Sequence, residues 1–288
     1  MSHPCIFCER TDRKLTNGHV FGEWIAEEFG RIPEGTSQLV AADGSTKNWP
    51  AAPFTDTVRV VCECCNSGWM SAMEGAVKDI LGPMMTKGWT TTMSTTTQTE
   101  LAGWALKTAL VIDHLHPRAR VVPDSAYPAL CRSKGAHATT AVWIGKRNEP
   151  WSSLVESLKQ QITTITLPDE IKHVEPLVRK DIADGAALFR FTFAVGHVAF
   201  QVFDHTLTEA KFNLGQGSGR HDTLRQIWPV HSQVTWPPSR PINDMGGIPG
   251  LHAGFNKPDE AEPPPPAQVA SRPNRAARRA AKRAERRQ

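Results

Sequence analysis

The chain has 288 residues, of which 40% are hydrophobic and 22% are charged, so it can bury one large core or two ordinary ones. Its six cysteines are too few and too clustered for a disulfide scaffold. The first residues carry neither a basic n-region nor an apolar h-region, and no apolar run approaches the length of a membrane span. We therefore expect a cytoplasmic protein without a signal peptide and without a membrane partner.

Residues 1–85 form the first predicted module. Sequence patterns predict a short helix at Glu23–Gly30, an inserted loop at 31–55 and a β-branched strand at Thr57–Val61. Apolar residues with a period near 3.6 predict a helix at Ser67–Leu81, and we expect Gly82-Pro83 to end it.

Two cysteine pairs lie in this module. Cys5 and Cys8 are followed, after a spacer of 53 residues, by Cys62 and Cys65. Two CxxC pairs on tight turns predict a tetrahedral four-thiolate zinc site with a structural role. The second pair could also be Cys62 with Cys64, but the spacing of Cys62 and Cys65 matches that of the first pair. The remaining alternative is four buried cysteines that bind no metal.

Residues 86–258 form a second predicted module, which begins in the threonine-rich stretch Thr86–Thr99. Its expected elements are a helix at Glu100–Leu115, a strand at Thr139–Ile144, a helix at Ser153–Gln161, a strand at Thr163–Leu167 and a β-hairpin at Ala187–His205. The hairpin would turn at Gly196-His197, and residues 226–258 would be irregular. Together the two modules predict an α+β fold.

Residues 259–288 form a proline-rich linker and a basic tail. The segment Arg272–Gln288 holds eight basic residues and one acid, a net charge of +7, so the other 271 residues sum to −3. Arginine at this density suits sequence-independent contact with nucleic-acid phosphates, although a purely solubilising tail is the alternative. We expect the tail to be disordered when free. The candidate nucleic-acid-binding residues are Arg275, Arg278, Arg279, Lys282, Arg283, Arg286 and Arg287.

The first module resembles a known family. The order CxxC, then Thr16-Asn17-Gly18-His19-Val20-Phe21, then CxxCNxGWMSxxE resembles the HNH endonucleases, and it is most similar to a divergent branch common in phages and actinobacteria. The resemblance implies a ββα-metal unit over residues 1–85, in which zinc knuckles support the site. It also implies that a phage-encoded protein would act in the host-cell cytoplasm.

The resemblance further implies hydrolysis of DNA phosphodiester bonds. His19 matches the general base that deprotonates the attacking water. Asn66 matches a ligand of the catalytic Mg²⁺ or Mn²⁺ ion, whereas Gly18 stands where the family usually has an acidic ligand. Glu74 and Glu23 are candidates to replace that acid, and the alternative for both is a solvated helix acid.

Two functions are therefore expected, and a third possibility places the function in residues 86–258. The first is a metal-dependent endonuclease that uses His19 as its base. The second is a catalytically inactive zinc-knuckle protein that binds nucleic acid and has lost the acidic metal ligand at Gly18.

Overall fold

The computed structural model describes residues 3–30, 35–40, 46–51, 54–115, 120–148, 155–161, 187–206 and 222–242. At 35–40, 46–51, 155–161 and 187 it describes the backbone alone. The chain divides into two compact units, Met1–Phe255 and Asn256–Gln288, and the second lies wholly outside the described residues. The first unit has the predicted α+β fold.

The described helices alternate with short strands in the N-terminal half. They are α1 (Glu23–Phe29), α2 (Glu63–Cys65), the π-helical segment η1 (Asn66–Met70), α3 (Ser71–Lys87), α4 (Thr95–Ile112), the 3₁₀ turn η2 (Asp113–Leu115) and α5 (Ala126–Ser133). No helix in the described ranges is long and apolar enough to cross a membrane.

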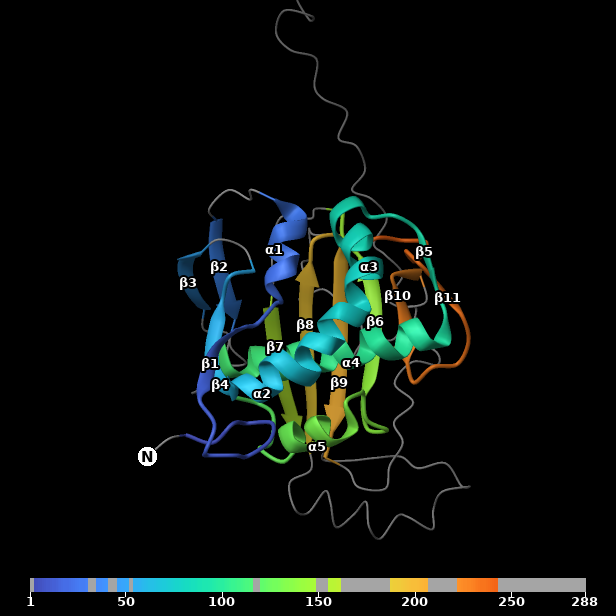
Figure 1. The fold of residues 1–288 in the computed structure, drawn as a ribbon. Helices are drawn as coiled ribbons and strands as arrows, with labels where there is room; N and C mark the ends of the chain where they lie inside the picture. The colour runs from blue at the N-terminus through green and yellow to red at the C-terminus, as the bar shows by residue number, and fades with distance from the viewer. Residues whose placement is uncertain are drawn as a thin grey trace, which may run out of the picture. The chain divides into compact units, whose positions relative to one another are not determined.

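The described strands form one large sheet and two pairs. The strands are β1 (Leu15–His19), β2 (Gly35–Val40), β3 (Thr46–Ala51), β4 (Thr57–Cys62), β5 (Thr91–Met93), β6 (Ala141–Lys146), β7 (Val155–Gln161), β8 (Ala187–Val195), β9 (Val198–His205), β10 (Leu224–Trp228) and β11 (Val234–Trp236). The large sheet has the order β10-β6-β9-β8-β7-β2-β3, and only its β2–β7 pair is parallel (Figure 1). β1 pairs with β4, and β5 pairs with β11.

The predicted hairpin at Ala187–His205 is confirmed as β8 and β9. Side chains of a strand alternate between its two faces, so every second residue reaches the helix-covered face. Phe193 and Phe200 are paired across the hairpin, and their rings stack with centroids 5.3 Å apart. Trp104 of α4 packs against both rings. Helix α4 therefore packs against the face of the sheet that this hairpin forms.

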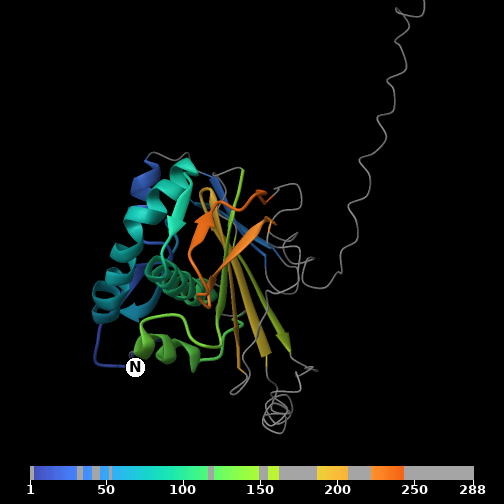
Figure 2. The same cartoon turned by 90° about the vertical axis from the view of Figure 1, so that its right-hand side faces the viewer.

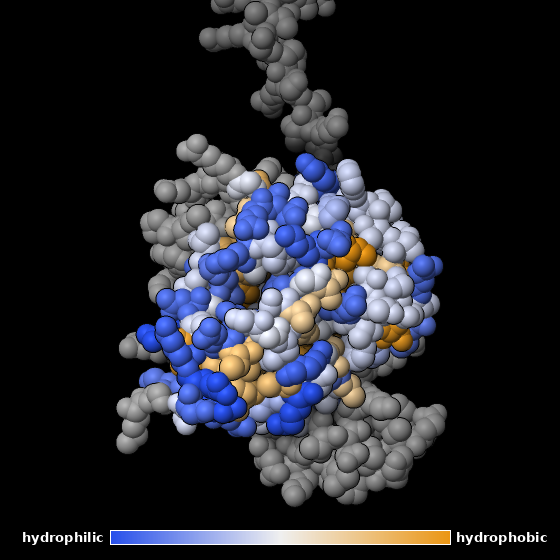
Figure 3. Space-filling model, viewed as in Figure 1, coloured by the Kyte–Doolittle hydropathy of each residue, from blue (hydrophilic) through white to orange (hydrophobic). Residues whose placement is uncertain are grey.

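Helices α3 and α4 cover one face of this sheet, as the two perpendicular views show (Figures 1 and 2). The sequence of α4 is apolar around nearly its whole circumference, which is the pattern of a helix buried on all sides. All its residues from Leu101 to Ile112 are buried. Residues of the two predicted modules thus share one hydrophobic core. The outer face over α1 is mostly hydrophilic, whereas a band of more hydrophobic residues runs along α3 (Figure 3).

Three sequence-based expectations about strands were wrong. The segment predicted as a helix at Ser153–Gln161 contains strand β7, and the predicted loop at 31–55 contains β2 and β3. The region 226–258, predicted to be irregular, contributes part of β10 and all of β11. In each case a neighbouring strand supplies the hydrogen-bond partners, and this tertiary pairing outweighs local propensity. The strand predicted at Thr163–Leu167 lies outside the described residues.

Two helix boundaries also differ from the prediction. α3 continues through Pro83 to Lys87 and ends at Gly88, which has a φ of +64°. Burial of Met84 and Met85 in the core favours this continuation over the break that proline usually causes. α4 begins five residues before the predicted start, because the Ser94 hydroxyl accepts a hydrogen bond from the backbone N–H of Thr97 and caps the helix.

The turn between β8 and β9 binds the end of α3. Gly196 has a φ of +57°, and the backbone N–H of His197 donates a hydrogen bond of 2.9 Å to the Met85 carbonyl oxygen. A Cβ atom at Gly196 would overlap that oxygen. The hairpin can approach α3 this closely only with glycine at the turn.

We expect Gly196→Ala to lower the free energy of unfolding by about 3 kcal/mol, because it adds backbone strain and a clash with α3. Chemical denaturation followed by circular dichroism measures this change. Gly135→Ala is the control, since a Cβ there meets nothing within 4 Å, and it should cost less than about 0.5 kcal/mol. Equal losses in the two variants would contradict the packing described here.

Candidate metal centre and the polar cavity beside it

The first cysteine pair sits on a turn that is attached to β4. The backbone N–H of Glu9 donates to the Cys5 carbonyl oxygen at 2.8 Å, which closes the turn. The N–H of Ile6 donates to the Val60 carbonyl oxygen at 3.0 Å. These bonds bring the N-terminal turn beside the end of β4, where Cys62 lies.

Four cysteine sulfurs converge at this junction. The Sγ atoms of Cys5, Cys8, Cys62 and Cys65 all lie within 4.8 Å of one another, and those of Cys8 and Cys62 are 3.6 Å apart. A tetrahedral zinc site with Zn–S bonds of about 2.3 Å requires sulfur–sulfur distances of about 3.8 Å. Cys64 is exposed and stands outside the cluster. The cluster therefore fits a structural zinc ion and selects Cys65, not Cys64, for the second pair.

Burial and hydrogen bonding act differently on these thiols. Burial raises the pKa of Cys62 and of Cys65. Burial also acts to raise the pKa of Cys5, but backbone N–H groups, with that of Cys62 first, outweigh it and lower that pKa. Four adjacent thiolates repel one another without a cation between them. A zinc ion would supply that charge and displace the remaining protons.

The residues expected to act in catalysis lie just beyond this cluster. β1 and β4 pair antiparallel, with Leu15 opposite Cys62 at one end and His19 opposite Thr57 at the other. The helical segment that follows Cys62 brings Asn66 back over β1. An ideal Cβ built on Gly18 would lie 3.6 Å from the Asn66 Oδ1 atom. Two strands and a helix thus place His19 and Asn66 around one cavity.

This polar cavity has a volume of about 400 Å³. Its polar lining comes from β1, α1, η1, α3 and α4, and it includes His19, Glu23, Asn66, Ser67, Glu74 and Lys107. The Nδ1 atom of His19 lies 3.3 Å from a carboxylate oxygen of Glu23, whose side chain is 74% exposed. A proton on Nδ1 that is shared with Glu23 leaves the lone pair of the imidazole on Nε2.

Glu74 is neither solvated nor free to act as a ligand. One carboxylate oxygen accepts hydrogen bonds from the indole N–H groups of Trp24 at 2.6 Å and Trp104 at 2.8 Å. The other oxygen pairs with the ammonium of Lys107, and the side chains of Glu74 and Lys107 are only 15% and 2% exposed. The carboxylate is therefore fully engaged in holding α1, α3 and α4 together.

The cavity does not present a complete site for a hard divalent ion. In the described ranges, the four cysteines are the only group of three or more His, Cys, Asp or Glu side chains arranged to hold a metal. Asn66 and the exposed carboxylate of Glu23, which also pairs with His19, remain as oxygen ligands, Gly18 offers no carboxylate, and Lys107 neutralises Glu74. Mg²⁺ and Mn²⁺ prefer several oxygen ligands, so these residues alone do not fit such an ion.

Lys107 was not predicted as a functional residue. It is the only charged residue between Leu101 and Ile112, and an isolated lysine in an apolar helix indicates a buried ion pair or a site. Its partner Glu74 is 33 positions away, so the pattern could not have identified the pair. The seven basic tail residues named above lie outside the described residues, and their contacts with nucleic acid stay a prediction.

Comparison of the chain with protein-family models, with curated proteins and with solved structures yields no match. The resemblance to the HNH endonucleases therefore rests on the motifs alone.

We expect the purified protein to contain one zinc ion per chain and Cys65→Ser to lose it. The loss should lower stability by roughly 3–5 kcal/mol, or about 10 °C in a domain of this size, because zinc binding contributes to folding. Metal analysis and thermal unfolding measure the two effects. Cys64→Ser is the matched control and should keep both zinc and stability. Zinc retained in Cys65→Ser would show that the four sulfurs do not hold it.

Proposed function

We propose that the β1–β4–α3 unit is the active site of an HNH-type endonuclease that hydrolyses DNA phosphodiester bonds. The observation that carries the proposal is the meeting of His19 and Asn66 over a polar cavity directly beside a four-cysteine cluster. The expected zinc ion would fix the N-terminal turn and β4, and thereby the strand that carries His19. DNA is the substrate that the motif resemblance implies.

His19 would act as the general base in this proposal. Its Nε2 atom would accept a proton from water, and the water oxygen would form a new bond to phosphorus while the bond to the leaving oxygen breaks. Glu23 would hold the imidazole through Nδ1 and stabilise its protonated form. The basic tail would add sequence-independent, salt-sensitive contacts with the phosphates.

A Mg²⁺ or Mn²⁺ ion would stabilise the negative charge that develops on the phosphate. Because Asn66 and Glu23 are too few to hold it, the substrate phosphate would have to supply further oxygen ligands. A requirement for high concentrations of the ion is a consequence of this sparse donor set.

We expect the protein to cleave plasmid DNA with Mg²⁺ or Mn²⁺ and His19→Ala to slow cleavage by about 10²- to 10⁴-fold, the usual contribution of a general base. A gel assay of supercoiled, nicked and linear plasmid measures the rate. His231→Ala is the control, since His231 is exposed and does not line the cavity. Cleavage that survives His19→Ala at full rate would remove His19 from the mechanism.

The second candidate function is nucleic-acid binding without cleavage. Two observations favour it: position 18 carries no carboxylate, and Glu74 is held by Lys107 and two tryptophans. On this proposal the wild-type protein binds DNA but does not cut it with either ion, and His19→Ala binds equally well.

Gly18→Asp separates the two candidates. The space at Gly18 accepts a side chain, which would point at the Asn66 amide oxygen and add an oxygen ligand there. For an active enzyme we expect the Mn²⁺ concentration needed for half-maximal cleavage to fall by about tenfold, which corresponds to about 1.4 kcal/mol, because the added carboxylate is a hard oxygen ligand. Gly18→Asn is the uncharged control. If the protein is instead catalytically inactive, Gly18→Asp should create cleavage activity that the wild type lacks. An unchanged Mn²⁺ requirement in an active enzyme would show that position 18 does not face the ion.

A further inference from the structure

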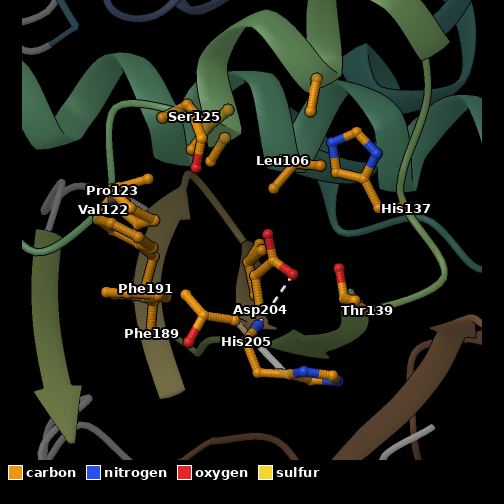
Figure 4. Close-up of a pocket in the computed structure, with 15 residues that line it drawn as sticks. Leu106, Val122, Pro123, Ser125, His137, Thr139, Phe189, Phe191, Asp204 and His205 are labelled. Carbon is orange, nitrogen blue, oxygen red and sulfur yellow. Dashed lines mark hydrogen bonds between the residues drawn. The ribbon is translucent and has the colours of Figure 1, made fainter. Parts of the chain in front are cut away.

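A second cavity lies between α4, α5 and the β8–β9 hairpin, and the proposed nuclease chemistry does not use it (Figure 4). Its volume is about 400 Å³. Most of its wall is apolar and comes from residues such as Leu106, Leu110, Val122, Phe189, Phe191 and Val202. A concave apolar wall with a few polar groups is the usual form of a site for a small organic ligand. We call it the Asp204 cavity.

Asp204 breaks the apolar pattern of β9. Val198, Phe200, Val202 and Asp204 are alternate residues of this strand and share its helix-covered face. Phe189 pairs with Asp204, and Phe191 pairs with Val202, across the hairpin. Figure 4 shows Asp204 in the cavity together with Phe189 and Phe191. A partly buried carboxylate among apolar side chains costs stability unless its charge is compensated, so its presence beside a cavity indicates a ligand.

In the described ranges, the one hydrogen bond to this carboxylate comes from the backbone N–H of His205, at 2.9 Å. The nearby Thr139, His137 and Thr140 also act to lower its pKa. Burial nevertheless raises the pKa of Asp204. Within the part of the chain that the structure describes, no lysine or arginine forms an ion pair with Asp204.

His137 is a titratable neighbour of Asp204. Burial lowers the pKa of His137, although the attraction of Asp204 acts in the opposite direction. Its Nε2 atom is buried and has no hydrogen-bond partner among the described residues. The Asp204 cavity thus contains a carboxylate that pairs with no lysine or arginine of the described ranges, and an imidazole nitrogen without a hydrogen-bond partner there. Both groups can interact with a ligand.

We propose that the Asp204 cavity binds a small organic amine, with its apolar body between α4 and Phe189 and Phe191 and its ammonium group on Asp204. The ammonium donates to the carboxylate in a charge-assisted hydrogen bond. His137 and Thr139 lie at the same polar end and offer further acceptors. The apolar wall contributes affinity, and Asp204 determines the preference for a cation over a neutral or anionic molecule.

Isothermal titration calorimetry of the full-length, zinc-loaded protein with benzylamine tests this proposal. Benzyl alcohol and benzoate are the neutral and anionic counterparts of similar size. We expect benzylamine to bind with a Kd of about 1 mM or lower and at least about tenfold more tightly than either counterpart. Asp204→Asn keeps the shape of the side chain and should weaken benzylamine binding by at least about tenfold.

Two further variants locate the site. Ala129→Phe adds a ring to the wall contributed by α5 and should abolish benzylamine binding. Asp222→Asn removes an exposed carboxylate elsewhere and should leave it unchanged. Circular dichroism and zinc content show that each variant is folded.

Equal affinity for benzyl alcohol or benzoate would overturn the proposal, as would benzylamine binding that is unchanged in Asp204→Asn. Absence of binding by both benzylamine and the larger amine tryptamine would overturn it as well.

Discussion

Four cysteine sulfurs meet where the N-terminal turn reaches the junction of β4 and the following helix, and the geometry of the polar cavity depends on this meeting. Cys62 ends β4, and Asn66 follows Cys65 directly, so the cluster sets the angle between strand and helix. β1 is paired with β4 and carries His19 at its far end. The Phe7 ring, between Cys5 and Cys8, packs edge-on against Trp69 and Tyr127, which joins the cluster to the rest of the core.

Helix α4 is the second organising element. Lys107 lines the polar cavity. Leu106, which precedes it, and Leu110 line the Asp204 cavity. A helix that is buried on all sides can contribute to two cavities, because adjacent residues point about 100° apart. Each cavity contains a partly buried carboxylate. Glu74 pairs with Lys107, whereas Asp204 forms no ion pair with a lysine or arginine in the described ranges. The first therefore holds helices together, while the second is the group that we propose to bind a ligand.

The hydrogen bonds and the ion pair of Glu74 remove it from the possible metal ligands that the HNH-like motif suggests. An acid two turns after Asn66 is well placed in sequence to reach an ion. In the fold, two indole N–H groups and Lys107 satisfy it, and separating a buried pair of this kind costs several kcal/mol. The donor set of the polar cavity is therefore poorer than the motif implies, whereas the cysteine scaffold matches it well.

The sequence by itself determined the elements that depend on neighbouring residues in the chain. These are the two CxxC pairs on tight turns, the hairpin of β8 and β9 with its alternating apolar residues, and the helix that ends before Gly30. Tertiary structure alone decided whether Val155–Gln161 is a strand, how far α3 runs past Pro83, and which partner Glu74 finds. The reason is physical. Turns and periodicity depend on neighbours in the chain, but strand pairing, buried ion pairs and cavities depend on residues far apart in sequence.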